Sequence, residues 1–255
     1  ANIYGGGESE VHIGAALKGK RDQAIIATKF NLNNLGDESP RDRIYRDVEQ
    51  SLTKLQTDVI DLYQIHFIPN GVPHEEYLEP LNDLVQSGKV RYIGECNYSS
   101  WRHADVNRAA EGNGWAPFVS SQNNYSLMHR QVELELLPYC TAHNIGFLPY
   151  FPLAGGWLTG KYAGVAAVPS GARRMVGQLQ GNDRSLAVLS QLDAYANENG
   201  HSVLELAFSW LLAHPSVSSV IAGAMTEEQV ESNANAGNWT LSLEERDAVD
   251  DIASW

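Results

Sequence analysis

Three side chains in the first 66 residues of the chain could together deliver a proton to a carbonyl oxygen. Tyr4 stands in the glycine-rich stretch ANIYGGGESE, Lys29 ends the apolar run AIIATK, and His66 ends the run VIDLYQIH. An ammonium group beside a phenol favours the phenolate and lowers the pKa of a tyrosine from about 10 toward the working range. An imidazole can donate a hydrogen bond to the same oxygen, and a well-aimed donor to a developing oxyanion is worth about 3 kcal/mol. These residue types therefore predict acid catalysis at a carbonyl.

Each of the three residues also has an ordinary structural explanation. A tyrosine among glycines is common in surface turns, a lysine after a strand usually meets solvent, and most histidines are structural. Chemistry is favoured because Lys29 and His66 end successive predicted strands, and side chains at such positions point into the mouth of a parallel barrel. The residues alone leave both interpretations open.

Six apolar runs alternate with helical patterns and would position these side chains. Near-continuous apolar strands are typical of parallel strands that are covered on both faces. The pattern predicts an α/β protein, a (β/α)8 TIM barrel that forms one domain over residues 1–255. The predicted strands are 24–29, 59–66, 90–97, 118–123, 145–150 and 219–224, and they end in Lys29, His66, Asn97, Gln122, Tyr150 and Gly223.

The helical segments between the strands have recognisable start signals. Ser39 and Pro40 offer an N-cap and a first-turn proline. In the first helix Val11, Ile13, Leu17 and small residues are the expected inner stripe. The predicted helices are 8–18, 41–55, 74–87, 99–111, 130–143, 184–198, 202–213, 226–236 and 242–254.

Composition narrows the classes of partner. The chain has 255 residues, is 43% hydrophobic and carries a net charge of −13, which argues against a nucleic-acid partner because such partners bind clustered Lys and Arg. Cys96 and Cys140 lack metal-binding spacing and fit a reducing, cytoplasmic location. No apolar run approaches the roughly 20 residues that span a bilayer, so no membrane association is expected. The sequence specifies no oligomeric state.

Several ordered motifs cover essentially the whole chain. They are ANIYGGGESEVHIGAALKGKRDQAIIATKF, SLTKLQTDVIDLYQIHF, VRYIGECNYSSW, SSQNNYSLMHR, LPYFPLAGGWLTGKY and SVIAGAMTEEQVESNANA. Together these motifs resemble the aldo-keto reductase superfamily, in particular its bacterial, potassium-channel-β-subunit-like branch.

The resemblance implies a catalytic role for each of the first three residues and a bound nicotinamide cofactor. Tyr4 would be the general acid, Lys29 the group that lowers its pKa, and His66 the group that orients the substrate carbonyl. Asn97 and Gln122 would hold the carboxamide and Tyr150 would stack on the ring, with no metal required. The implied cofactor-binding residues are Cys96, Asn97, Gln122, Tyr150, Phe151, Leu153, Gly155, Lys161, Gly223, Ala224, Gln229 and Asn233.

Three departures from the family pattern shape these expectations. The family aspartate that pairs with the lysine, together with the first strand, first helix and most of the second strand, is expected before Ala1. Cys96 stands where many relatives have serine, and a thiol is a weaker hydrogen-bond donor. The stretch 223–229 matches the adenosine 2′-phosphate pocket but contains no Lys or Arg. The family resemblance implies NADPH, and NADH is the alternative because this stretch lacks a cationic side chain for the 2′-phosphate.

The leading functional hypothesis is an NAD(P)H-dependent reductase of small aldehydes or ketones. A nucleotide-binding regulatory subunit with little turnover is the alternative, and a barrel hydrolase would need a carboxylate pair or metal ligands that the strand ends lack. The substrate pocket is expected in the loops after the strands, which contain Ile3, Phe30, Phe67, Ile68, Tyr98, Trp101 and Trp157.

Overall fold

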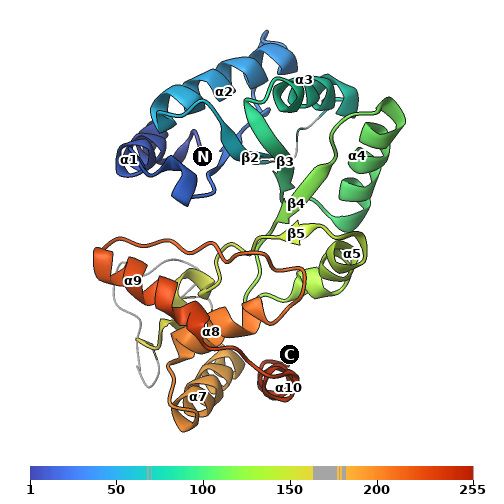
Figure 1. The fold of residues 1–255 in the computed structure, drawn as a ribbon. Coiled ribbons are helices and arrows are strands. Elements are labelled where there is room, and N and C mark those ends of the chain that lie inside the picture. The colour runs from blue at the N-terminus through green and yellow to red at the C-terminus, as the bar shows by residue number, and fades with distance from the viewer. Residues whose placement is uncertain (68, 70, 163–176, 178, 180–181, 255) are drawn as a thin grey trace. The chain divides into compact units, whose positions relative to one another are not determined.

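The computed structural model describes the chain in two compact units, Ala1–Gln122 and Asn123–Trp255 (Figure 1). The described residues are all those outside positions 68, 70, 163–176, 178, 180–181 and 255. Each unit is built around its own apolar core.

The N-terminal unit is a sheet of parallel strands joined by helices. Its strands are β1 (Ala27–Phe30), β2 (Ile60–Ile65), β3 (Val90–Cys96) and β4 (Phe118–Gln122), and each pairs in parallel with the next. A 3-10 turn (Tyr4–Gly7) and α1 (Glu8–Ala16) precede the sheet, followed by a 3-10 turn at Arg21–Gln23. The connecting helices are α2 (Pro40–Leu55), α3 (His74–Gln86) and α4 (Ser100–Asn113). Helix α2 packs on β1, α3 on β3 and α4 on β4.

Helix α2 follows from its local sequence. The side chain of Ser39 accepts a hydrogen bond from the backbone N–H of Asp42 at 3.1 Å, and proline occupies the first helical position. The helix ends where Gln56 takes a left-handed conformation, with φ 52°. Its predicted apolar stripe is confirmed, because the following residues are all buried: Ile44, Val48, Leu52 and Leu55.

The predicted inner stripe of α1 is wrong at Val11 and Ile13 but confirmed at Leu17, which packs against the apolar core of this unit. Val11 and Ile13 are each 39% exposed, whereas Glu10 and Gly14 face inward. The reason is the close approach of α1 to the end of α2: a Cβ at Gly14 would lie 2.6 Å from the backbone oxygen of Lys54. Only glycine fits at this contact. The inward face of α1 therefore carries Gly14 and the carboxylate of Glu10 in place of the apolar side chains of Val11 and Ile13.

The C-terminal unit is mainly helical. Its core is centred on the buried indoles of Trp157 and Trp210. Helices α8 and α10 each begin with a capping box, in which Ser202 pairs with Glu205 and Ser242 with Glu245. Its elements are 3-10 turns at Gln131–Glu133, Ala154–Thr159 and Ala236–Asn238, α5 (Leu136–His143), β5 (Gly146–Phe147), α7 (Asp183–Glu198), α8 (Val203–Leu212), α9 (Glu227–Asn235) and α10 (Leu243–Ile252).

Two predicted elements of this unit differ from the structure. The predicted strand 219–224 makes only an isolated parallel bridge, between Ile221 and Tyr150, and β5 is two residues long. Pro149 explains part of this shortening, because proline has no N–H to donate to a ladder. The predicted helix 130–143 begins only at Leu136, because Glu135 has a non-helical backbone with φ −142°.

The order of elements confirms the α/β class and agrees with the predicted (β/α)8 TIM barrel. Parallel strands alternate with helices through the N-terminal unit, which is the pattern of that fold. No helix among the described residues is long and apolar enough to cross a membrane. The description of the whole chain as one domain stays a prediction.

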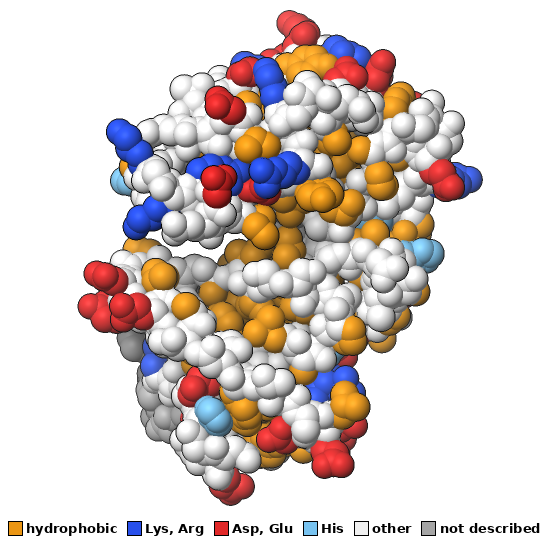
Figure 2. Space-filling view, in the orientation of Figure 1, with side chains coloured by type: hydrophobic (Ala, Val, Ile, Leu, Met, Phe, Trp, Pro, Cys, Tyr) orange, Lys and Arg blue, Asp and Glu red, His pale blue; other side chains and the backbone are white. Residues whose placement is uncertain are grey.

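The surface carries mixed charges. Several basic side chains on the face drawn in Figure 2 lie against acidic ones. Ion pairs of this kind join Arg46 to Glu38 at 2.6 Å and Arg108 to Asp105 at 2.7 Å. Such pairing leaves these arginines less able to attract a polyanion than the same residues clustered alone.

Candidate active site

The structure brings Tyr4, Lys29 and His66 into one cluster within the N-terminal unit. The hydroxyl of Tyr4 lies 3.3 Å from Nε2 of His66, and the two rings meet edge to face with centroids 5.4 Å apart. Nζ of Lys29 lies 5.8 Å from the centroid of the Tyr4 ring. Lys29 and His66 are 6% and 8% exposed, but Tyr4 is 45% exposed. The cluster is therefore buried at Lys29 and His66 and reaches solvent at Tyr4.

A glycine turn places Tyr4 over the ends of β1 and β2. Three successive glycines after Tyr4 have positive φ angles of 57°, 65° and 101°, which side chains with a Cβ rarely adopt. Before the turn, the backbone N–H of Asn2 donates to the carbonyl oxygen of Lys29 at 3.2 Å. The Asn2 side chain donates to Asp47 Oδ2 at 2.9 Å. The backbone of His66 is held by its amide N–H, which donates to the backbone oxygen of Phe30 at 2.8 Å.

The His66 imidazole is neutral at pH 7. Burial, followed by the nearby charge of Lys29, lowers its pKa from 6.5 to about 4. Phe67 covers one face of the ring, with centroids 4.3 Å apart and planes inclined by 11°. Nδ1 of His66 is buried and has no hydrogen-bond partner among the described residues. A neutral ring can donate from Nε2 only in the tautomer that leaves Nδ1 as the acceptor.

Lys29 and Cys96 are neighbours, and burial disfavours the charged form of each side chain. Burial lowers the pKa of the Lys29 ammonium from its ordinary value, and Cys96 opposes this shift. Burial raises the pKa of the Cys96 thiol to about 12, although Lys29 acts in the opposite direction. In the described part of the chain, Lys29 forms no ion pair with a carboxylate. At neutral pH Cys96 is therefore a small uncharged thiol beside the lysine.

Asn97 and Gln122 stand at the ends of β3 and β4, and the Asn97 side chain contacts His66. Asn97 has a left-handed backbone with φ 67°, and its Nδ2 donates to the His66 carbonyl oxygen at 3.1 Å. Its backbone N–H donates to the Gln122 oxygen at 3.0 Å. Gln122 is 4% exposed, and its buried Oε1 has no hydrogen-bond partner within the described ranges. That oxygen is an acceptor available to a bound donor.

The predicted cofactor residues of the C-terminal unit are also placed by the structure. Tyr150 accepts a hydrogen bond from the Tyr125 N–H at 3.3 Å, and its ring meets that of Phe151 at 77°. Phe151 is 44% exposed and has φ 56°. Leu153 is half-buried, and Gly155 has φ 72° in the following 3-10 turn. Their part in cofactor binding stays a prediction.

The remaining predicted residues of this unit lie at its surface. Nζ of Lys161 lies 4.9 Å from the centroid of the Tyr162 ring. Oε1 of Gln229 accepts from the Met225 N–H at 2.8 Å, which closes the loop before α9. Gly223 and Ala224 are exposed, and Asn233 is half-buried.

The aromatic residues predicted for the substrate pocket divide into two groups. Phe30, Tyr98 and Trp157 are at most 1% exposed and belong to the apolar interior, so their prediction as pocket residues is wrong. Ile3 and Trp101 are 48% and 65% exposed and remain available. Phe67 is 39% exposed and stacks on His66, so it is also available beside the cluster. Ile68 lies outside the described residues.

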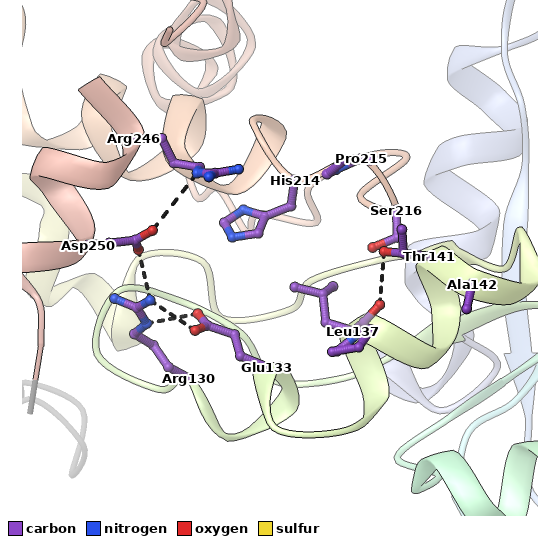
Figure 3. Close-up of a pocket in the computed structure, with 11 residues that line it drawn as sticks. Arg130, Glu133, Leu137, Thr141, Ala142, His214, Pro215, Ser216, Arg246 and Asp250 are labelled. Carbon is purple, nitrogen blue, oxygen red and sulfur yellow. Dashed lines mark hydrogen bonds and ion pairs between the residues drawn. The ribbon is translucent and has the colours of Figure 1, made fainter. Parts of the chain in front are cut away.

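A pocket of about 520 Å³ in the C-terminal unit contains none of the predicted site residues (Figure 3). Arg130 donates two hydrogen bonds to Glu133, at 2.8 and 2.9 Å, and pairs with Asp250 at 2.8 Å. Tyr125 donates to the same Glu133 carboxylate at 2.8 Å. Because these charges neutralise one another, the pocket offers little reason to bind a charged ligand. In the part of the chain that the structure describes, no group of three or more potential metal ligands is found.

Sequence reasoning missed one buried group beside the cluster. Glu10 is 1% exposed and accepts hydrogen bonds from Thr28 and Ser51. Its only sequence signal is the spacing of four residues between Glu10 and Gly14, which places both on one face of α1.

Comparison with known proteins identifies the family. The chain is 37% identical to Aldo-keto reductase YhdN of Bacillus subtilis (strain 168) over 262 residues, which cover 99% of this chain and 77% of that protein. It is 32% identical to the Uncharacterized oxidoreductase YrpG of the same organism, over 99% of this chain and 81% of the relative. It is 29% identical to Versiconal hemiacetal acetate reductase of Aspergillus parasiticus, over 96% and 79%. The sequence profile of the Aldo/keto reductase family matches residues 1–254, and the chain therefore belongs to this family.

Proposed function

We propose that the chain is an NAD(P)H-dependent reductase that converts aldehyde or ketone carbonyls to alcohols, with Tyr4 as the proton donor. The observation that carries the proposal is the cluster itself. The Tyr4 hydroxyl lies 3.3 Å from His66 Nε2, with the buried Lys29 ammonium beside the phenol ring. Membership of a family with named reductases supports the reaction class.

The three side chains have distinct proposed roles. Because its pKa is about 4, His66 is neutral at pH 7 and orients the carbonyl oxygen through a hydrogen bond from Nε2. Tyr4 is then left as the donor of the proton to that oxygen. Lys29 stabilises the phenolate that remains after the transfer. A nicotinamide nucleotide supplies the hydride when bound, and the protein supplies orientation and the proton.

The amide groups of the N-terminal unit fit the carboxamide of such a nucleotide. A carboxamide has both donors and acceptors, and the buried Gln122 Oε1 is an acceptor that still has no partner among the described residues. A backbone hydrogen bond, from the Asn97 N–H to the Gln122 carbonyl oxygen, fixes the backbones of the two residues beside each other. From the family resemblance we assign the ring-stacking role to Tyr150. NADPH is the preferred nucleotide, and NADH is the alternative because residues 223–229 contain no Lys or Arg.

Oxidation of the reduced nucleotide by an activated aromatic aldehyde tests the proposal. Tyr4→Phe removes only the hydroxyl and should lower kcat by about 10²- to 10⁴-fold, the usual contribution of general acid catalysis. Nucleotide affinity should stay near that of the wild type. Tyr92→Phe is the matched control, because Tyr92 is 59% exposed and plays no proposed role.

The assay also separates the alternatives. Full turnover by Tyr4→Phe would refute the general-acid role. Tight nucleotide binding by the wild type without turnover of a broad carbonyl panel would instead assign the chain as a regulatory, nucleotide-binding subunit. The placement in the potassium-channel-β-subunit-like branch rests on the sequence motifs. We propose a cytoplasmic location because both cysteines are buried, free thiols.

A further inference from the structure

A buried carboxylate joins three elements of the N-terminal unit. Glu10 Oε1 on α1 accepts hydrogen bonds from Thr28 Oγ1 on β1, at 2.6 Å, and from Ser51 Oγ on α2, at 2.8 Å. Glu10, Thr28 and Ser51 are each at most 1% exposed. A carboxylate without solvent is costly to keep in a protein interior, so both hydroxyls stabilise the position of α1.

The position of Glu10 along the chain links this contact to the active site. Thr28 directly precedes Lys29 on β1, and α1 begins directly after the glycine turn that carries Tyr4. Three glycines with positive φ form that turn, and glycine restricts the backbone less than any other residue. The distance between Tyr4 and Lys29 therefore depends on what holds the turn at its two ends.

The two ends of the turn have separate attachments. On the N-terminal side, Asn2 donates to the Lys29 backbone oxygen at 3.2 Å and to Asp47 at 2.9 Å. On the C-terminal side, the hydrogen bond from Thr28 to Glu10 attaches α1 to the strand that carries Lys29. The second attachment, from Ser51, leads to a helix that carries none of the three proposed catalytic groups.

We propose that Glu10 is a positioning residue: through its hydrogen bond with Thr28 it holds the Tyr4 turn in register with Lys29. The inference rests on the proposed function and adds a residue that acts through two others. It distinguishes the two hydrogen bonds of Glu10. The bond from Thr28 affects catalysis, whereas the bond from Ser51 affects only stability.

Paired substitutions of the two hydroxyls test this distinction. Thr28→Val is nearly isosteric and removes the hydroxyl on the strand, and Ser51→Ala removes the hydroxyl on the helix. We expect Thr28→Val to lower kcat about tenfold or more while KM for the nucleotide stays within about twofold, because misplacement of a reacting group by about 1 Å is costly. The basic limb of its kcat pH profile should move upward, since the phenolate loses part of its stabilisation by Lys29. Ser51→Ala should retain the wild-type kcat and pH profile.

Substitution of Glu10 itself provides a rescue control. Glu10→Gln keeps an oxygen that can accept from both hydroxyls and should retain kcat within about threefold, whereas Glu10→Leu should behave like Thr28→Val or worse. If Glu10→Leu does not fold, the Thr28→Val and Ser51→Ala pair still decides the question. Equal kcat values and superimposable pH profiles for that pair would overturn the proposal.

A second readout separates this proposal from the proposed function. Tyrosine labelled with ¹³C at the hydroxyl-bearing carbon reports the ionisation of Tyr4 by NMR, with Tyr4→Phe as the assignment control. If the wild type reduces no carbonyl, the proposed function fails. The positioning role is then supported if the Tyr4 titration moves in Thr28→Val but not in Ser51→Ala, and it is refuted if both variants titrate like the wild type.

Discussion

The burial of His66 beside Lys29 predicts a specific loss of stability in acid. Its pKa is lowered from 6.5 to about 4 in the folded protein, so the unfolded chain binds the proton more tightly. The stability that neutral His66 contributes is fully present above pH 6.5. It is lost as the pH falls toward the pKa of the folded state. The difference between the two pKa values corresponds to about 3 kcal/mol, of which about 2.5 kcal/mol is lost by pH 4.5.

Urea unfolding of the wild type and of His66→Gln between pH 7.5 and pH 4.5 measures this effect. Other histidines with lowered pKa values, His129 and His214, contribute equally to both proteins and cancel in the difference. The unfolding free energy of the wild type should fall relative to that of the variant by more than about 1 kcal/mol over this range. His12→Gln, at a side chain that is 80% exposed, is the control and should follow the wild type. Parallel curves for the wild type and His66→Gln would refute a neutral, desolvated imidazole.

Three further substitutions follow from the same geometry. Lys29→Met should raise the pKa of His66 only part of the way to 6.5, because burial lowers that pKa more than Lys29 does. An NMR titration of the imidazole measures this change, and an unchanged pKa would mean that the two residues do not interact. Asn97→Ala should lower the unfolding free energy by about 1 kcal/mol more than Asn97→Gly, because the left-handed φ of 67° strains alanine but not glycine. Both variants should weaken nucleotide binding in a fluorescence titration. Gly14→Ala should cost about 1 to 3 kcal/mol in thermal or urea unfolding, because its Cβ would lie 2.6 Å from the Lys54 oxygen; an unchanged stability would mean that α1 can shift freely.

Features fixed by local sequence were predictable. The start of α2 follows from Ser39 and Pro40, because the cap and the first-turn proline act within a few residues. The ends of β1 and β2 were placed closely enough to expect Lys29 and His66 in one region, and the structure puts both against Tyr4. The catalytic roles of the three residues stay predictions.

Features fixed by contacts between distant segments were not predictable. Apolar residues at Val11 and Ile13 indicate an inner stripe, but the backbone of α2 comes so close to α1 that a glycine occupies the contact. The importance of Glu10 depends on hydroxyls 18 and 41 residues away. The run 219–224 has strand-like composition, yet whether it forms a ladder depends on its neighbour, where Pro149 cannot donate.

The thiol of Cys96 gives this protein a built-in chemical reporter. With a pKa of about 12, only about one thiol in 10⁵ is ionised at pH 7, and alkylating reagents attack the ionised form. Labelling of Cys96 by iodoacetamide would therefore require the end of β3 to open to water. The rate of labelling at Cys96, followed by mass spectrometry, would measure how often the folded protein exposes the interior beside Lys29, with a native cysteine as the reporting group.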